Sequence, residues 1–91
     1  MTDKQIKKLH CFIKFYGKTN QCTKAIEECA ELQQQLCKAL TGTGSIYLLA
    51  EEIADVTIML EQLKIMFNCS DDVNEIIDYK IQRQIERMAK Q

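Results

Sequence analysis

Two short acidic segments hold the residues of this 91-residue chain that are best suited to chemistry. EECAEL at 27–32 and EEIADV at 51–56 both read acid-acid-x-Ala-acid-apolar. In an α-helix, residues three positions apart lie about 60° apart around the axis, so each segment would project a pair of carboxylates from one side of a helix. The two pairs are Glu28 with Glu31 and Glu52 with Asp55.

Four carboxylates that meet between two helices favour a bound metal ion. Like charges held close together repel one another, and burying them is costly unless a cation neutralises them. The second segment lies in the most apolar part of the chain, which indicates that Glu52 and Asp55 are partly enclosed. Ligands that are all oxygen atoms favour a hard ion, Mg²⁺ first and Mn²⁺ second. Because Mg²⁺ on carboxylates commonly completes its shell with water and substrate phosphates, the pattern suggests a nucleotide substrate.

Two other interpretations of these acids compete with this one. An acid pair at this spacing is common on the solvated face of a helix, so either segment alone would be weak support for a metal site. A di-iron carboxylate centre would use Glu-x-x-His pairs, and the only histidine, His10, lies outside both segments. Two similarly built segments, one of them in apolar surroundings, favour the metal site.

The elements that must position these acids are helices. The chain has no proline, its β-branched residues do not alternate, and glycine-rich or polar breaks occur at YGKTN, TGTGS and NCSDD. These breaks predict four helices joined by short turns, and no strand. Ser45 or Thr43 is the expected N-cap of the third helix, and Ser70 or Asp71 that of the fourth. The expected helices span residues 3–16, 20–40, 45–67 and 72–90.

The two central helices differ in their hydrophobic patterns. Helix 45–67 is apolar around nearly its whole circumference, and such a helix is expected to be buried on all sides. One small chain cannot surround it, so we expect a homo-oligomer, a tetramer, with this third helix buried at its core. Helix 20–40 is amphipathic, with Glu28 and Glu31 opposite an apolar stripe formed by Cys22, Ala25, Ile26, Cys29, Leu36 and Leu40.

Composition narrows the class of protein. A chain of this length is expected to form a single domain, residues 1–91, with a small core of its own. A net charge of −1 provides no basic field for nucleic acid or a membrane surface, and no stretch approaches the roughly 18 apolar residues of a membrane span. The charged N-terminus has no apolar segment behind it, so we expect a cytoplasmic protein. Five cysteines without a CxxC pair are expected to be reduced core residues.

The two motifs together resemble a known family. KAIEECAEL followed by LAEEIADVTIML is similar to the MazG-like, all-α nucleoside triphosphate pyrophosphohydrolases, whose signature is EExxE, a variable spacer and then ExxD. The resemblance covers residues 18–67, and DYKIQRQIERM looks like the family's C-terminal helix in its short, single-domain phage and bacterial members. It implies a four-helix bundle that cleaves NTP or dNTP into a nucleoside monophosphate and pyrophosphate. It also implies a dimer or a tetramer built as a dimer of dimers, with sites formed by more than one subunit.

The resemblance assigns roles to the acids. Glu28 and Glu31 match the metal ligands of the first motif, and Glu52 and Asp55 match those of the second. Glu27, the first acid of EExxE, would be the catalytic residue that holds or polarises the attacking water.

Substrate contacts are expected from cations and amides. Negative charge that develops on the phosphates needs cations nearby. Lys80 matches a lysine on the family's last helix, whereas Gln84 stands where the family commonly has asparagine. Lys24, Arg83 and Arg87 are further candidates. No particular nucleobase is indicated, and the candidates for contacting it are Gln21 and Asn20 by hydrogen bonds and Phe12, Tyr16 and Tyr47 by stacking.

Two alternative functions remain open. Phosphoribosyl-ATP pyrophosphohydrolase, a sibling enzyme of histidine synthesis, has a similar size and a similar Lys-x-x-Glu-Glu start, here formed by Lys24, Glu27 and Glu28. That family typically has a histidine four residues after the ExxD aspartate, where this chain has Met59. The other alternative is a non-enzymatic helical assembly module, in which the third helix forms only an oligomer core and the acids form a solvated seam.

Overall fold

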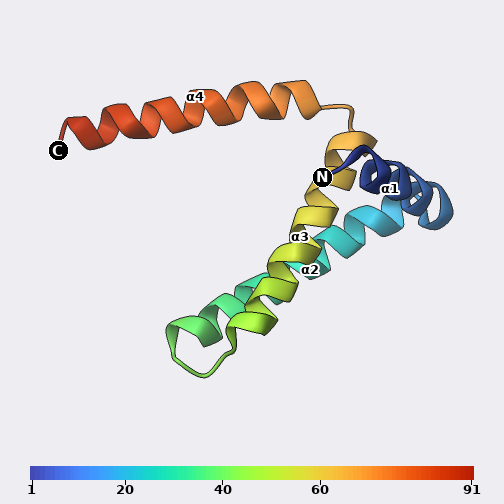
Figure 1. Cartoon of the computed structure of the whole chain (residues 1–91), viewed down its shortest axis with the longest axis horizontal. Coiled ribbons are helices and arrows are strands. Elements are labelled where there is room, and N and C mark those ends of the chain that lie inside the picture. Colours follow the sequence, from blue (N-terminus) through green and yellow to red (C-terminus); the bar gives the residue numbers. More distant parts are fainter.

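A computed structural model describes residues 1–91 and is entirely helical (Figure 1). The prediction of an all-α chain with four helices and no strand is confirmed, and each helix begins and ends within two residues of its expected position. The helices are α1 (Asp3–Tyr16), α2 (Lys18–Leu40), α3 (Ile46–Met66) and α4 (Ser70–Ala89).

The helix starts follow local capping chemistry only in part. The Ser45 Oγ accepts a hydrogen bond of 3.0 Å from the Leu48 N–H, which confirms Ser45 as the N-cap of α3. The expectation that Ser70 or Asp71 caps α4 is wrong. Cys69 precedes that helix without a side-chain cap, and Ser70 already lies in its first turn.

The turns set the directions of the helices. Gly42 (φ 73°) ends α2, and Asn68 (φ 50°) ends α3, both in the left-handed region that glycine and asparagine tolerate best. At each turn, paired backbone hydrogen bonds close the end of the helix: the Thr43 N–H donates to the Lys38 carbonyl, and the Cys69 N–H donates to the Lys64 carbonyl. These bonds satisfy carbonyl groups that would otherwise lack partners, so the exit direction of α4 is defined by three residues, 67–69.

The α2–α3 hairpin forms the body of the chain, and α1 packs against both of its helices. The apolar core is small and consists of Leu9, Ala25, Val56 and Met59. Glu28 is buried on the side of α2 that faces α3, as the two acidic motifs predicted, whereas most of the apolar stripe of α2 is exposed in the isolated chain. Gln21 is buried on α2 as well, and its side chain donates a hydrogen bond to Gln62 of α3. All five cysteines are free and none is buried, so their expected core position is wrong.

The fourth helix does not close a bundle within one chain. It contacts only α3, has no buried residue and projects away from the α2–α3 hairpin (Figure 1). No helix is both long enough and apolar enough to cross a membrane.

The isolated chain is far more open than a compact domain of its length. Its accessible surface is 7341 Å², whereas a folded monomer of this mass exposes about 5,500 Å². Its radius of gyration is 16.0 Å, against about 12 Å for a compact domain of 91 residues. Only seven residues are buried, and the helix expected to be buried on all sides, α3, leaves Ile46, Ile53 and Leu60 exposed.

Candidate metal centre

The antiparallel pairing of α2 and α3 brings three of the predicted metal ligands together. One carboxylate oxygen from each of Glu28, Glu31 and Glu52 lies within 4.8 Å of the other two. The first two residues come from α2 and the third from α3, as the two-motif interpretation predicted. Asp55, one helical turn beyond Glu52, lines a small hollow together with Glu28 at the edge of the cluster.

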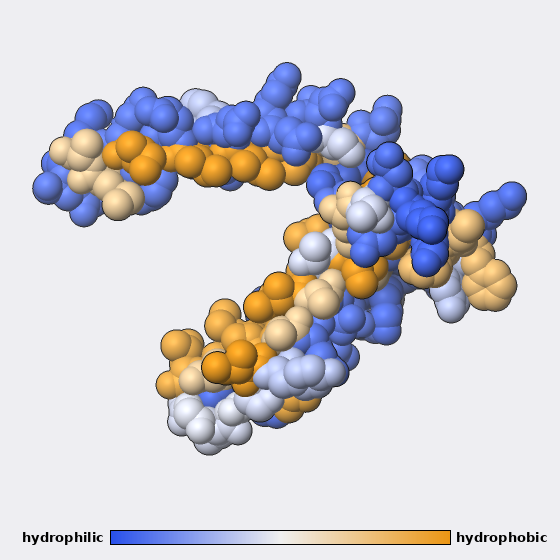
Figure 2. All heavy atoms as spheres, viewed as in Figure 1, coloured by the Kyte–Doolittle hydropathy of each residue, from blue (hydrophilic) through white to orange (hydrophobic).

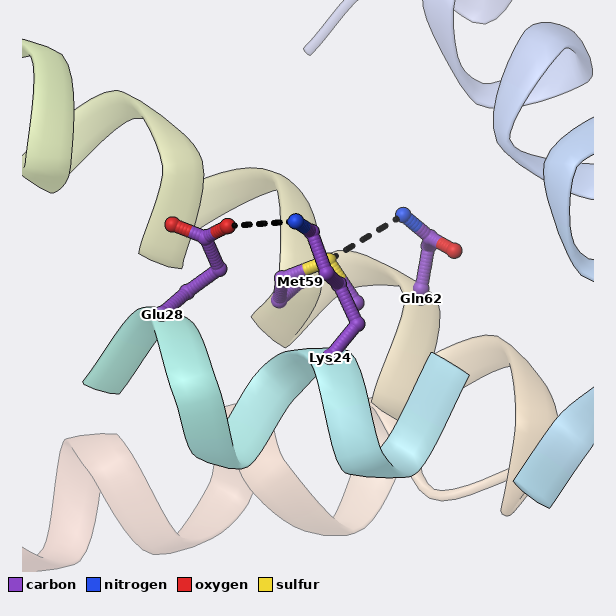
Figure 3. A network of polar contacts seen from close by, with 4 residues as sticks. All are labelled: Lys24, Glu28, Met59 and Gln62. Atoms are coloured by element: carbon purple, nitrogen blue, oxygen red, sulfur yellow. Dashed lines mark hydrogen bonds and ion pairs between the residues drawn. The ribbon is translucent and has the colours of Figure 1, made fainter. Parts of the chain in front are cut away.

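Burial leaves part of this cluster without partners. The Glu28 side chain is only 8% exposed. The Lys24 ammonium lies 3.1 Å from the Glu28 Oε1 (Figure 3), but the Glu28 Oε2 is buried without a hydrogen-bond partner. The Glu52 Oε2 is buried and unpartnered in the same way. A buried acceptor without a donor costs free energy, and these two oxygens are free to accept a cation.

The pKa values of Glu52 and Asp55 are both raised, because these acids are buried beside other negative charges. Burial, followed by the negative charges of Glu31 and Asp55, raises the pKa of Glu52 above its ordinary value. Burial, followed by the negative charge of Glu28, raises the pKa of Asp55. The hydrogen bond and the charge of Glu28 raise the pKa of Lys24, which is the one cation paired with the cluster. One lysine offsets only one of the four negative charges, and a divalent ion would offset two more.

A cavity of about 450 Å³ opens along α2 beside the acids. Five of the predicted functional residues line this cavity together with Thr23 and Met59, namely Tyr16, Asn20, Gln21, Lys24 and Glu27. A smaller hollow of about 180 Å³ lies between the same lysine and Glu28, Asp55, Ile58 and Met59. Lys24 and Met59 line both spaces, so the cavity and the carboxylates are parts of one site.

Two buried glutamine side chains are hydrogen-bonded to each other beside this site. The Gln21 Nε2 donates a 2.7 Å hydrogen bond to the Gln62 Oε1, which joins α2 to α3. The Gln62 Nε2 lies 3.6 Å from the Met59 sulfur (Figure 3), and this glutamine is only 1% exposed. The sequence interpretation missed Gln62, although a glutamine inside the most apolar segment of the chain was a signal that it has a buried partner.

The remaining predicted substrate contacts lie elsewhere in the isolated chain. Lys80, Arg83 and Gln84 are on α4, which does not contact α2. The Arg83 guanidinium lies 5.5 Å from the centre of the Tyr79 ring on its own helix. Phe12 lines a separate cavity near the N-terminus, and Tyr47 is exposed.

No protein-family model, no curated protein and no solved structure matches this chain.

Proposed function

We propose that the protein is a Mg²⁺-dependent nucleoside triphosphate pyrophosphohydrolase. Its substrates would be NTP or dNTP, and its products a nucleoside monophosphate and pyrophosphate. The observation that carries this proposal is the cluster of Glu28, Glu31 and Glu52, with two buried unpartnered oxygens, next to a polar cavity. The resemblance of the two acidic motifs to the MazG-like enzymes supplies the reaction class.

The residues present fit a hard divalent ion. Glu28, Glu31, Glu52 and Asp55 would hold Mg²⁺, with Mn²⁺ as a substitute, because they offer only oxygen ligands. When bound, the ion would polarise phosphate oxygens and lower the pKa of a water molecule. It would also occupy the place where the Glu28 and Glu52 oxygens now lack partners.

The chain's own side chains supply the remaining chemistry. Glu27 lines the cavity and carries a carboxylate that accepts the proton of the attacking water. The water oxygen forms a bond to the α-phosphorus as the bond between this phosphorus and the α–β bridging oxygen breaks, and pyrophosphate leaves with that oxygen. The Lys24 ammonium stabilises the charge that develops on the phosphates. Gln21 borders the same cavity and would hydrogen-bond the base.

A homo-oligomer is part of this proposal. The excess of exposed surface and the exposed apolar side chains of α3 support the association of chains, with α3 at the core of a tetramer. The same exposed surface also favours a second candidate function, a non-enzymatic helical assembly module. The two buried unpartnered carboxylate oxygens weigh against that candidate. Buried unpaired charges lower stability, and the assembly of helices does not require them.

Pyrophosphate release from a panel of NTPs and dNTPs, together with phosphoribosyl-ATP, tests the proposed function. The reactions would contain Mg²⁺, Mn²⁺ or EDTA, and the wild type would run beside Glu52→Gln and the matched control Glu51→Gln, which alters an exposed acid outside the cluster. We expect metal-dependent release that Glu52→Gln abolishes and Glu51→Gln retains. Turnover of phosphoribosyl-ATP alone would favour the sibling enzyme. The absence of turnover from folded, oligomeric protein would favour the assembly module.

A further inference from the structure

The cavity along α2 is mostly polar, unlike the apolar surfaces of α4 and the hairpin. Apolar atoms lie along the side of α4 that faces the α2–α3 hairpin and along the hairpin opposite it (Figure 2). The exposed apolar side chains of α4 include Ile77 and Ile81, and this surface belongs to the homo-oligomer proposed above. The cavity, in contrast, has only two apolar lining residues, Tyr16 and Met59. Its polar groups therefore decide which ligand it accepts.

Three of these polar side chains already donate hydrogen bonds to the protein itself. The Asn20 Nδ2 and the Thr23 hydroxyl each donate to the backbone carbonyl four residues earlier, at 2.8 Å and 3.0 Å. The Gln21 Nε2 donates to the Gln62 Oε1 at 2.7 Å. None of the three accepts a hydrogen bond from the protein in return. Each of them therefore offers an unused oxygen acceptor at the cavity that it lines.

The orientation of the Gln21 amide is set by Gln62 and Met59. The buried Gln62 Nε2 lies 3.6 Å from the Met59 sulfur, which is a weak acceptor and has no proton to give (Figure 3). Turning the Gln62 amide over would place its oxygen against that sulfur and its N–H against the N–H of Gln21. The Gln62 Oε1 therefore faces the Gln21 Nε2. The Gln21 Oε1 has no partner and is not buried, so it is available to a ligand.

The cavity has two chemically different ends. Asn20 and Gln21 offer acceptors near the start of α2, whereas Lys24, the one cation of the lining, pairs with Glu28 of the carboxylate cluster. Seven residues separate Gln21 from Glu28, which is about 10 Å along the helix axis. A nucleotide is divided in the same way, because its phosphates need cations and its base is joined to them through the sugar. The acceptor end is therefore the end for the base.

The rest of the lining suits an aromatic ring. The volume of about 450 Å³ lies within the range of about 300–1,000 Å³ that is typical of small-molecule sites. Tyr16 is half exposed at the acceptor end, so its ring is open to stacking on a base. The thioether of Met59 adds a polarisable apolar contact.

We infer that this cavity selects nucleotides whose base carries an exocyclic amino group, as cytosine and adenine do. The inference rests on the proposed function and adds a substrate class to it. The amino group donates one hydrogen bond to the Gln21 Oε1, and the Asn20 Oδ1 offers an acceptor for its second N–H. Uracil and hypoxanthine have a carbonyl oxygen at the same position, and two acceptors that face each other form no hydrogen bond. Gln21 is thus a specificity-determining residue, and Gln62 is its positioning residue.

Equilibrium binding of α,β-methylene nucleotide analogues tests the inference without turnover, because the bond that would break is replaced. Two matched pairs, the analogues of CTP and UTP and those of ATP and ITP, differ in whether the base carries an amino group or an oxygen. Calorimetric titration of the full-length protein with Mg²⁺ measures all four affinities. We expect the amino-bearing member of each pair to bind at least about tenfold more tightly. Equal affinities within both pairs, or a preference for the oxygen-bearing members, would overturn the inference.

Glutamine-to-leucine variants separate the positioning role from a merely structural one. Gln21→Leu removes the acceptor, and Gln62→Leu leaves the Gln21 amide free to turn over, so either variant should bring the two affinities of a pair close to equality. Gln33→Leu alters an exposed glutamine of the same helix outside this cavity and should keep the preference. A substitution that only loosens the fold would weaken both members of a pair alike. A preference that survives Gln21→Leu would overturn the inference.

The double variant Gln21→Leu, Gln62→Leu gives the same readout if Gln62→Leu alone does not fold, because it replaces the buried amide pair with two apolar side chains. A preference that persists in this double variant would also overturn the inference. Metal-dependent pyrophosphate release with equal kcat/KM for both members of each pair would overturn the base preference and leave the proposed function standing. The absence of both binding and turnover would refute the proposed function, and the base preference with it.

Discussion

Two residues of the carboxylate cluster, Glu28 and Glu52, each have a buried oxygen without a hydrogen-bond partner. Glu28 is buried, pairs with Lys24 through one oxygen and leaves the other without a partner. Glu52 has a buried oxygen without a partner and a raised pKa. Such groups destabilise the metal-free protein, and the cation that we propose for this site would offset that cost.

Replacing Glu52 with glutamine should stabilise the metal-free protein. The substitution removes one of several mutually repelling charges and keeps the shape of the side chain. We therefore expect a higher Tm than the wild type in EDTA, and a smaller rise in Tm when Mg²⁺ is added. Thermal unfolding followed by circular dichroism measures both, with Glu51→Gln as the control. A lower Tm in EDTA for Glu52→Gln alone would argue that this carboxylate supports the fold.

The raised pKa values of Glu52 and Asp55 predict the pH dependence of stability. The folded state binds protons more tightly than the unfolded state at these groups, so the free energy of unfolding falls as pH rises. The change should begin near the ordinary carboxyl pKa of about 4 and end above the raised pKa values of the folded protein.

Thermal unfolding in EDTA across this pH range tests the expectation. The double variant Glu52→Gln, Asp55→Asn should show a flatter profile than the wild type. Identical profiles for the two proteins would mean that these acids do not carry the shifted protons.

At the scale of the elements, the sequence predicted where the helices lie along the chain, but not what covers their apolar sides. The breaks at glycine and asparagine predicted four helices, and the serine before α3 predicted its cap. The acidic motif of α2 predicted that Glu28 faces α3, as it does, but the pattern did not predict that Ile26 and Leu40 of the apolar stripe are exposed. Hydrophobic periodicity identifies which residues share a side of a helix, but it does not reveal which neighbour covers that side. The two acidic pairs were predicted to meet, because their similar spacing suits adjacent antiparallel helices.

The amide pair between α2 and α3 should make a measurable contribution to stability. Gln62→Leu leaves the buried Gln21 amide without its partner, which costs about 1–3 kcal/mol. Adding Gln21→Leu removes the unsatisfied group, so the double variant should recover part of that loss. Urea unfolding of both single variants and the double variant gives the coupling energy. Strictly additive effects would show that the two glutamines act independently.

The starts of α3 and α4 allow a direct comparison of two serines. Ser45→Ala removes the hydrogen bond to the Leu48 N–H and should lower the free energy of unfolding by about 1 kcal/mol. Ser70→Ala removes no cap, so its effect should stay within about 0.5 kcal/mol. Urea unfolding measures both effects, and equal losses would contradict the assignment of the caps.

At the scale of the whole molecule, the isolated chain has too small a core for its length. Seven buried residues and an extended α4 leave most of its apolar side chains in water. The apolar circumference of α3 led us to expect a partner chain. The sequence did not indicate that α4 separates from the hairpin, because that depends on the turn at Asn68.

If folding and association are coupled, stability should depend on protein concentration. Mass action then raises the Tm as the protein concentration rises. A concentration range of about a hundredfold should reveal the effect. The double variant Ile77→Asp, Ile81→Asp should lose this dependence together with its association. Calorimetry at several concentrations measures the effect, and a constant wild-type Tm would indicate that the chain folds as a monomer or within an oligomer too tight to dissociate over that range.

The claim at the centre of this account is that α2 and α3 hold a divalent ion between them. Isothermal titration of the full-length protein with Mn²⁺ tests it most directly, because it depends on neither the substrate nor turnover. We predict saturable binding at Glu28, Glu31, Glu52 and Asp55, weakened strongly by Glu28→Gln and by Glu52→Gln and retained in Glu51→Gln. Wild-type protein that is folded and binds no Mn²⁺, or binding that survives both cluster substitutions, would contradict the account.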